Sequence, residues 1–599
     1  MSPPIPDHTT LGLPLPELVE DAPAAPYTTP RGAERWVARL PLAHVGETAR
    51  LVYTGLRDLN RRPIKNTDRL RILEAFARPV NFVTESLERH YLEQPLPLSE
   101  KRLKVAKLAR ALQQEMAVGH KIVIEMGLAG RLGRIDGRAL RRAIYGALHY
   151  LGETLLQSYL IYVAPPAGVW AETHHLYYLA EHNQLHREVV QSHLSDYRPA
   201  NSIVELYKEI LLLATANPYR LAQREIQTLH GHLSDWSRQA ALHPLVDPRH
   251  PPGLFAVHLD EDAPPAYYVP TSDRSRLPCL RILDVAKVAE LTRHYLETAS
   301  CAVGKSLPPS TFRRLVLAWG APPKRGFART QRRALVQMVV GIGAVHHVIE
   351  RDQGRHPGGP EPEPAHFEAG DTAPPPPDAP IDVWDVAENP TLQTILEDDL
   401  GLGEPQSGLH LEAAGAEEPD PYPTTACHLL NESPTGCCLR CGGEDAPLIV
   451  VGMVIAVQLR SDPEGENDER WRVGVIRWIR QEGKNELTLG AELIGPRAEP
   501  VHLRRIVGGQ PRGEPQPALL VPEVRHLEQP PTVIAPALFD AGDELCLYQS
   551  GGQRRIRLLK ALECTNSFGQ YQYLPLEDRA VTEEEASAES EFEEIWHYL

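Results

Sequence analysis

Along the first half of the chain, apolar side chains recur at steps of three and four. The clearest run covers residues 67–87, and similar runs follow Ser99 and Asp136. This spacing places the apolar residues on one face of a helix, which a globular protein buries against its neighbours. It predicts an all-α domain over residues 33–320 with six or more helices. Near residues 253–270, two short apolar runs separated by an acidic loop predict a small β insert.

Toward the C-terminus the pattern changes to short strands. The runs Leu448–Leu459, Trp471–Arg480 and Glu486–Ile494 are apolar or alternate with a period of two, and turn residues bound them. This arrangement predicts a small antiparallel barrel or sandwich over residues 424–508. Further strand-like runs predict an additional β segment over residues 515–580.

Three segments show no periodicity and are rich in proline or acidic residues. Such segments cannot bury enough apolar surface to fold alone. We therefore expect a disordered leader over residues 1–32, a flexible insertion over residues 351–423 and a solvated acidic tail over residues 581–599.

Composition narrows the class of protein. A chain of 599 residues is too long for one core, and its formal net charge of -17 argues against general nucleic-acid binding. The N-terminus has no secretory pattern, and the longest apolar run, residues 447–459, is too short to cross a bilayer as a helix. Eight cysteines do not form a disulfide scaffold in so long a chain. We expect a cytoplasmic protein with no membrane span and no nucleic-acid partner.

The helical region offers no catalytic pattern. His174, His175, His182 and His186 include pairs spaced for one helical face, but no carboxylate stands among them in a metal-ligand pattern. The chain has no glycine-rich phosphate loop, no nucleophile elbow and no persuasive pair of acids. We predict that the protein is not an enzyme and has no catalytic residues, no metal and no cofactor.

The cysteines between Cys427 and Cys441 have the local look of a zinc site. Successive side chains of a strand point to opposite faces, so Cys437 and Cys438 should diverge. Buried cysteines also act as small apolar side chains. We therefore predict no metal here, with zinc as the alternative.

A basic cluster precedes a valine-rich run within residues 321–350. Its arginines include Arg329, Arg332 and Arg333, and the alternation from Val336 onward predicts a strand. In an acidic chain, such a cluster is either a solvated surface or a site for an anion. Arginine suits the second role because its planar fork bonds phosphate in a bidentate manner and stacks on planar bases.

Residues 431–436, Asn-Glu-Ser-Pro-Thr-Gly, interrupt two apolar runs. The composition predicts a strand, a tight turn and a second strand. The turn offers an amide, a hydroxyl and a glycine, where a ligand edge could approach the backbone.

Taken together, the arginine segment, the N-x-S-x-x-G turn and the strands that follow in order resemble a PilZ domain. The resemblance covers residues 324–349 and about 427–506. It implies a six-stranded barrel that binds cyclic di-GMP. The expected fold is therefore an N-terminal all-α domain, which resembles no family that we recognise, followed by a PilZ-like antiparallel β-barrel with a long disordered insertion.

The resemblance also assigns the ligand contacts. The arginines before the first strand would clamp phosphates and guanine edges, the asparagine and serine of the turn would hydrogen-bond a guanine, and the glycine would permit the tight path. The predicted contacts are Arg329, Arg332, Arg333, Asn431, Ser433 and Gly436.

We therefore expect a cyclic di-GMP receptor that couples ligand binding at the barrel to the helical domain and a protein partner. The alternative is a degenerate PilZ protein that binds no nucleotide and acts as a scaffold. The two motifs can meet only if the insertion loops out between them. Such loops are tolerated, because closure costs only about 0.6 kcal/mol more per doubling of length.

Overall fold

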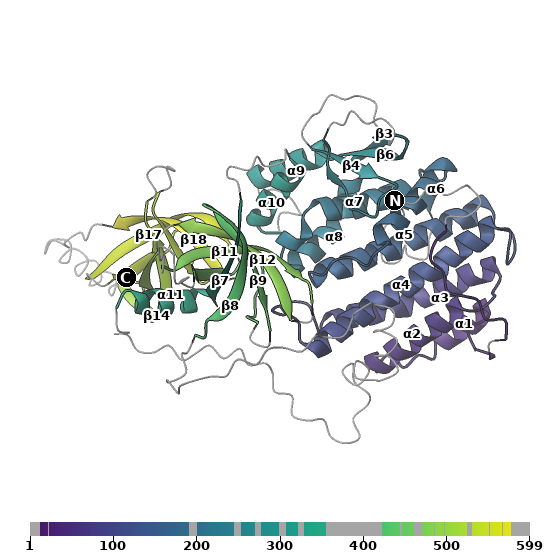
Figure 1. Ribbon diagram of the computed structural model, residues 1–599, viewed down its shortest axis with the longest axis horizontal. Helices are drawn as coiled ribbons and strands as arrows, with labels where there is room; N and C mark the ends of the chain where they lie inside the picture. The colour runs from purple at the N-terminus through teal and green to yellow at the C-terminus, as the bar shows by residue number, and fades with distance from the viewer. Residues whose placement is uncertain are drawn as a thin grey trace, which may run out of the picture.

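Most helices and most strands occupy separate parts of the molecule. In the computed structural model the helices up to residue 319 pack together on one side with a small sheet, and on the other side the strands from residue 330 onward close into two β-barrels (Figure 1). This confirms the predicted order of a helical domain followed by an antiparallel barrel. The expected insertion, apart from its ends, and the acidic tail lie outside the described residues. The structure describes residues 12–576 except 22, 191–200, 245–252, 270–276, 299–306, 321–328, 355–421, 444–445, 460–469, 484, 496–497, 524–529, 550–551 and 566.

The amphipathic runs form helices that bury their apolar faces in one core. Long helices α3, α4 and α5 pack against one another and against shorter helices. The described helices that precede the first barrel are α1 (Pro30–Val37), α2 (Val45–Asn60), α3 (Asn66–Glu88), α4 (Glu100–Leu128), α5 (Gly137–Leu160), α6 (Val169–His182), α7 (Ile203–Thr215), the short 3₁₀ helix η2 (Pro218–Arg220), α8 (Gln223–Ser237), the short 3₁₀ helix η3 (Leu277–Cys279), α9 (Ala286–Thr298) and α10 (Pro309–Trp319).

Local capping sets several helix starts. Ser99 is the N-cap of α4, and the Asp136 side chain accepts a hydrogen bond from the Ala139 N–H at the start of α5. Ser202 and Glu205 form a reciprocal capping box at the start of α7. The side chains of Asp136 and Ser202 thereby satisfy backbone N–H groups that a helix cannot pair internally, whereas Ser99 makes no side-chain capping bond.

The segment before α1 packs along the helices. Leu13 is buried, and its backbone N–H donates to Glu125 Oε1 at 3.0 Å. The Tyr27 hydroxyl donates to Asp58 Oδ2 at 2.9 Å. The prediction of a disordered leader over residues 1–32 is therefore wrong for the part that the structure describes. A few apolar and aromatic side chains anchor a stretch whose proline content alone indicates disorder.

A small antiparallel sheet covers the end of the helical domain. Its strand order is β3-β6-β4-β5, so the predicted insert at residues 253–270 supplies two of these strands. The other two come from flanking sequence. The strands are β3 (Ala241–Pro244), β4 (Leu254–His258), β5 (Ala266–Tyr267) and β6 (Leu280–Asp284), and a separate short pair is β1 (Val189–Val190) with β2 (Asn201–Ser202).

The first barrel closes because its fourth strand in sequence returns to pair with its first. The order is β10-β11-β12-β9-β8-β7, and β10 pairs antiparallel with β7. Its interior is lined by residues that face one another in register, such as Leu429, Leu439, Leu489 and Ile479, all buried. The strands are β7 (Thr330–Val340), β8 (Thr425–Ser433), β9 (Gly436–Gly442), β10 (Val454–Leu459), β11 (Arg472–Gln481) and β12 (Glu486–Gly495).

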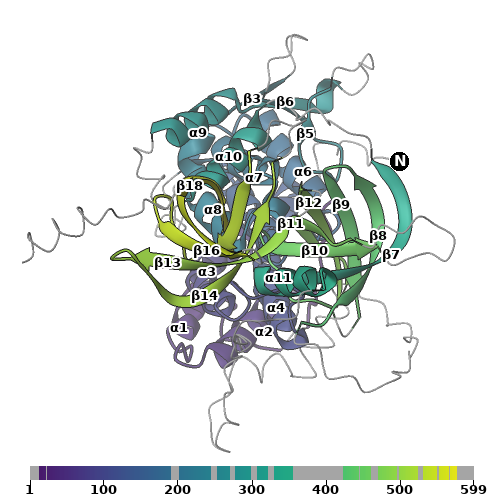
Figure 2. The ribbon, with the colours of Figure 1, turned by 90° about the vertical axis from the view of Figure 1, so that its left-hand side faces the viewer.

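Helix α11 (Ile342–Asp352) follows β7 directly, where residues 321–350 were predicted to hold only the arginine segment and a strand. Gly341 takes a φ of 95°, a conformation that favours glycine, and it ends the strand. Val345 and Val348 are then buried between the first barrel and the strands that follow it. Figure 2 shows α11 beside β10, between the two barrels.

The strand Glu499–Val507 (β13) belongs to the second barrel, although the sequence placed residues up to 508 in the first. The link between β12 and β13 is short and carries no change of composition, so the sequence gives no boundary there. The second barrel has the order β13-β14-β15-β18-β17-β16 and its own buried core. Its other strands are β14 (Gln510–Val521), β15 (Thr532–Pro536), β16 (Glu544–Gln549), β17 (Gly552–Cys564) and β18 (Phe568–Leu576).

The first barrel is joined closely to the helical domain. Leu96 and Ile449 exchange two backbone hydrogen bonds, of 2.9 and 2.8 Å. The Gln481 N–H donates to the Tyr162 carbonyl oxygen at 2.8 Å. The buried residues of the helices and of the first barrel also form one continuous apolar core. Movement of the barrel against the helices would therefore break both backbone bonds and apolar packing.

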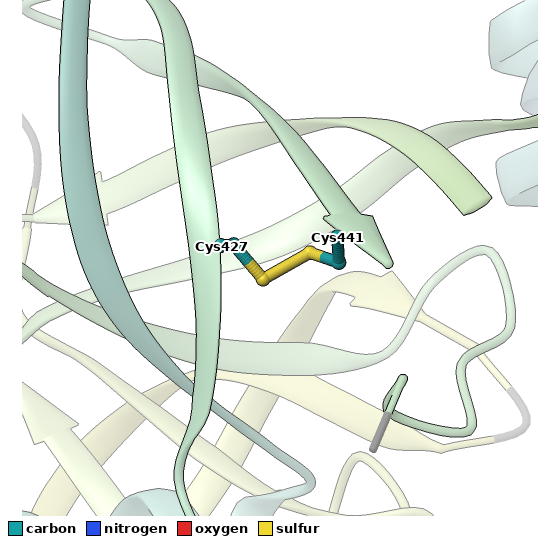
Figure 3. Close-up of a disulfide and its surroundings, with 2 residues drawn as sticks. All are labelled: Cys427 and Cys441. Carbon is teal, nitrogen blue, oxygen red and sulfur yellow. A yellow bond between two sulfur atoms is a disulfide. The ribbon is translucent and has the colours of Figure 1, made fainter. Parts of the chain in front are cut away.

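A disulfide links two strands of the first barrel. Cys427 and Cys441 lie directly opposite each other on β8 and β9 and are joined by their sulfur atoms (Figure 3). Two of the sulfur atoms weighed as zinc ligands are thus bonded to each other. Cys437 faces the barrel core and Cys438 the other side of the sheet, as strand alternation predicted. Among the described residues, no group of three or more His, Cys, Asp or Glu is placed to hold a metal ion.

A histidine pair lies where α11 meets β13. The rings of His346 and His502 are 4.5 Å apart, with His347 nearby and Glu350 Oε2 at 3.8 Å from His346 Nδ1. Burial, then the neighbouring histidines, lower the pKa of His346 to about 3. The native state therefore binds fewer protons than the unfolded chain below pH 6.5, and stability is lost as the pH falls. Between pH 6.5 and pH 5 we expect the contribution of His346 to the free energy of unfolding to fall by about 2 kcal/mol.

The variant His346→Leu should show a smaller fall in melting temperature over this range, whereas the exposed control His44→Leu should behave as the wild type. Burial raises the pKa of Glu88 to about 7. That carboxyl group changes stability in the opposite direction, so the difference between variant and wild type is the quantity to measure. An identical pH dependence for His346→Leu and wild type would contradict the prediction.

Candidate functional site

The two predicted motifs meet on neighbouring strands, although 100 positions separate Arg332 from Glu432. Strands β7 and β8 pair antiparallel, with Thr330 opposite Glu432 and Gln331 opposite Asn431. Arg329 immediately precedes this first pair. The long insertion therefore connects two strands that lie side by side.

A bulge in β7 shapes the arginine segment. The register shifts between Gln331 and Ala334, so Arg332 and Arg333 lie in the irregular stretch. Arg332 Nη1 donates to Glu432 Oε1 at 2.9 Å. Arg329 and Arg333 are exposed, and within the described part of the chain neither has a carboxylate partner. The guanidinium groups of Arg329 and Arg333 are thus available to bind an anion, whereas that of Arg332 already binds Glu432. The weaker candidate Arg325 lies outside the described residues.

Glu432 sits inside the turn motif and holds arginines of two strands. Besides Arg332 it accepts from Arg472 on β11, with Nη2 at 3.4 Å. The carboxylate partly neutralises this end of the sheet and fixes the position of Arg332. This contact could not be predicted from the sequence, because Arg472 lies outside both motifs in the chain.

The predicted turn is a two-residue hairpin between β8 and β9. Ser433 pairs with Gly436, and the Ser433 hydroxyl donates to the Gly436 carbonyl oxygen at 3.3 Å. The Leu493 N–H donates to the Thr435 carbonyl oxygen at 3.0 Å. A Cβ atom at Gly436 would lie 2.8 Å from the Ala491 carbonyl oxygen. Gly436 is therefore needed for close approach to β12.

Register places a row of side chains on the outer face of the barrel. Asn431 is opposite Gln331 and Cys438, Cys438 is opposite Gly490, and Gly490 is opposite Trp478. Directly opposed residues of antiparallel strands point to the same face. Along β9 and β12, the residues of this row are adjacent to the buried interior residues Leu439 and Leu489. Because successive side chains of a strand point to opposite faces, the row faces away from the barrel core.

The indole of Trp478 lies across Gly490, where any side chain would overlap it. Trp478 is half-buried, and a bulge between Ile476 and Trp478 sets its direction. Sequence reasoning placed Trp478 in a strand and missed its part in the site. Gly490 could have indicated this arrangement from the sequence, because a glycine inside a strand often marks a place where another group approaches the backbone closely.

Cys438 connects the row to the arginine segment. Burial raises the pKa of the Cys438 thiol, and the charge of Arg329 and the amide of Asn431 oppose this shift. Arg329 and Asn431 therefore both act on this thiol group. An indole, an amide and an arginine fork thus share one surface. They could stack on a planar base, hydrogen-bond its edge and bind a phosphate.

The histidines of α6 do not form a site. His174 is buried, with Nδ1 2.6 Å from the Tyr207 hydroxyl oxygen and Nε2 2.9 Å from the Ala263 carbonyl oxygen. Burial lowers its pKa to about 4, so the ring is neutral.

In the described segments, no helix combines the length and the apolar character that crossing a bilayer requires.

Comparison with known proteins covers nearly the whole chain. Three consecutive parts match the models of the cyclic-di-GMP receptor FimW: its N-terminal domain over residues 31–248, its middle PilZ domain over residues 254–500 and its C-terminal β-barrel domain over residues 501–576. The cyclic-di-GMP receptor FimW of Pseudomonas aeruginosa is 30% identical over 608 residues, which cover 95% of this chain and 96% of the relative.

These matches confirm the PilZ resemblance and correct one expectation. The helical region was taken to resemble no known family, yet it matches the N-terminal domain of the same receptor. The middle match begins at residue 254, so it also takes in strands β4, β5 and β6 of the small sheet and helices α9 and α10, whereas β3 belongs to the N-terminal match.

Proposed function

Because the chain belongs to the family of the cyclic-di-GMP receptor FimW, we propose that it binds cyclic di-GMP on the outer face of the first barrel. The observation that carries the proposal is the pairing of β7 with β8, which brings Arg329 next to the turn that holds Asn431. The ligand has two phosphates and two guanines. Forked cations beside an amide and an indole match that combination.

Within this face we assign three kinds of contact. The free arginines, Arg329 and Arg333, bind phosphate and guanine. Asn431 hydrogen-bonds a guanine edge, while Ser433 and Gly436 shape the turn that presents it. Arg332 has a smaller part, because Glu432 already holds its guanidinium.

Isothermal titration of the full chain tests the proposal. Cyclic di-GMP should give saturable heat, and cyclic di-AMP, which keeps the phosphates and changes the base edges, should bind at least about tenfold more weakly. The ligand should be recovered unchanged, since we propose a receptor and not an enzyme. Absence of heat with cyclic di-GMP would contradict the proposal and favour the scaffold function.

We propose further that binding is relayed to the helical domain and from there to a protein partner. Support comes from the contacts of β11, the strand that carries Trp478. The Arg480 guanidinium lies 5.4 Å from the centre of the Tyr219 ring, and Gln481 bonds the Tyr162 carbonyl. A shift of β11 on ligand binding would move these contacts.

A further inference from the structure

The helical domain reaches the edge of the candidate face through η2. Asn217 has a φ of 56°, which turns the chain after α7, and η2 then packs against β11. Tyr219 contacts Arg480, as described above. The next residue, Arg220, is therefore held beside the strand that carries Trp478.

Arg220 lies among charged residues of three domains. Arg477 of β11 donates from Nε to Glu492 at 2.7 Å and from Nη2 to Glu563 of the second barrel at 2.9 Å. Arg314 of α10 is paired with Glu225 of α8. Each of these two arginines thus has its own carboxylate.

Arg220 differs from them. In the described portion of the chain its guanidinium has no carboxylate partner, and the side chain keeps contact with solvent. The packed domains around it desolvate it in part, and that desolvation, followed by the charge of Arg477, lowers its pKa. The charge of Glu492 opposes the shift. An anion at this point would remove the repulsion between neighbouring cations.

The contact of Tyr219 with Arg480 fixes the side of β11 that η2 covers. Arg480 is two residues after Trp478 in an unbroken register, so the two side chains point to the same face of the sheet. The β7 arginines therefore border the face on one side, while Arg220 borders it on the side of β11 and β12. The turn and Trp478 lie between them.

We propose that Arg220 is a ligand contact contributed by the helical domain, and that it binds a phosphodiester of the cyclic dinucleotide. A cyclic dinucleotide carries two phosphodiesters on opposite sides of its ring. The β7 arginines bind one, and Arg220 binds the other from across the face. This inference rests on the proposed function, and it makes the site a junction of two domains.

Titration of full-length Arg220→Ala with cyclic di-GMP tests the inference. Loss of one charged contact should weaken binding about tenfold and reduce its dependence on ionic strength. Arg220→Lys, which keeps the charge, should restore part of the affinity and of the salt dependence. The matched control is Arg224→Ala, an exposed arginine of α8 that faces Glu93 at 4.0 Å, and it should bind as the wild type.

The outcomes separate the two proposals. If wild type binds and Arg220→Ala binds equally well, the inference falls and the proposed function stands. If wild type does not bind, both fall. A loss of affinity with unchanged salt dependence and no recovery in Arg220→Lys would show a structural role and also overturn the inference.

Discussion

Replacing both Arg329 and Arg333 by alanine is expected to weaken cyclic di-GMP binding by at least about a hundredfold. Both side chains are exposed at the start of β7, and neither is neutralised by a carboxylate among the described residues. Each can therefore give its full fork to the ligand. Because neither guanidinium forms an ion pair with a carboxylate in the described part of the chain, the melting temperature of the ligand-free variant should match that of the wild type.

Isothermal titration measures the loss, and a second pair of arginines provides the control. Arg554 and Arg557 are exposed on β17 of the second barrel, and their double alanine variant removes the same charge. It should bind as the wild type. Arg332→Ala should lose less affinity than the pair, because Glu432 holds that side chain. Equal binding by the Arg329/Arg333 variant and the wild type would exclude the face as the ligand site.

The sequence was sufficient to predict the two halves of the proposed site. Arg329 and Arg333 stand before a strand, and Asn431 to Gly436 form a turn between strands, so each half follows from local pattern. Their meeting depended on the resemblance, because periodicity does not say which strands pair. The resemblance gave the expectation of a six-stranded barrel, and the structure shows that β7 and β10 are the pair that closes it.

The remaining features are tertiary, and local pattern could not supply them. Trp478 faces the site because of a bulge in β11, and bulges shift the alternation from which side-chain direction is read. Glu432 and Arg472 meet through pairing of distant strands. Arg220 reaches the face only because η2 packs on β11. A charged residue in a helical domain carries no local sign of a ligand in another domain.

The predicted end of the first barrel at residue 508 was wrong for a related reason. The strand at residues 499–507 has the same alternation whether it closes the first barrel or opens the second. Pairing of Leu503 with Leu547 and Gln516 assigns it to the second. Helix α11 was missed because Gly341 ends the strand within an apolar run that continues into the helix. Composition does not change at either point.

Gly436→Ala is expected to weaken binding by about tenfold or more, because the new Cβ would lie 2.8 Å from the Ala491 carbonyl oxygen. That oxygen belongs to the backbone of β12 and cannot rotate away as a side chain can. The hairpin must therefore move off β12, which displaces Ser433 and Asn431 from their places beside the arginine segment. Some loss of melting temperature should accompany this shift.

Thr435→Ala is the matched control, since it changes an exposed residue of the same turn while keeping the backbone path. It should bind with near wild-type affinity in the same titration. If Gly436→Ala bound equally well, the turn would not position the ligand contacts. The comparison also separates two ways of losing affinity. The arginine variant removes charge from an intact face, whereas Gly436→Ala leaves every charge in place and moves the backbone that aligns the amide with it. Only a site built from both strands loses affinity in each case.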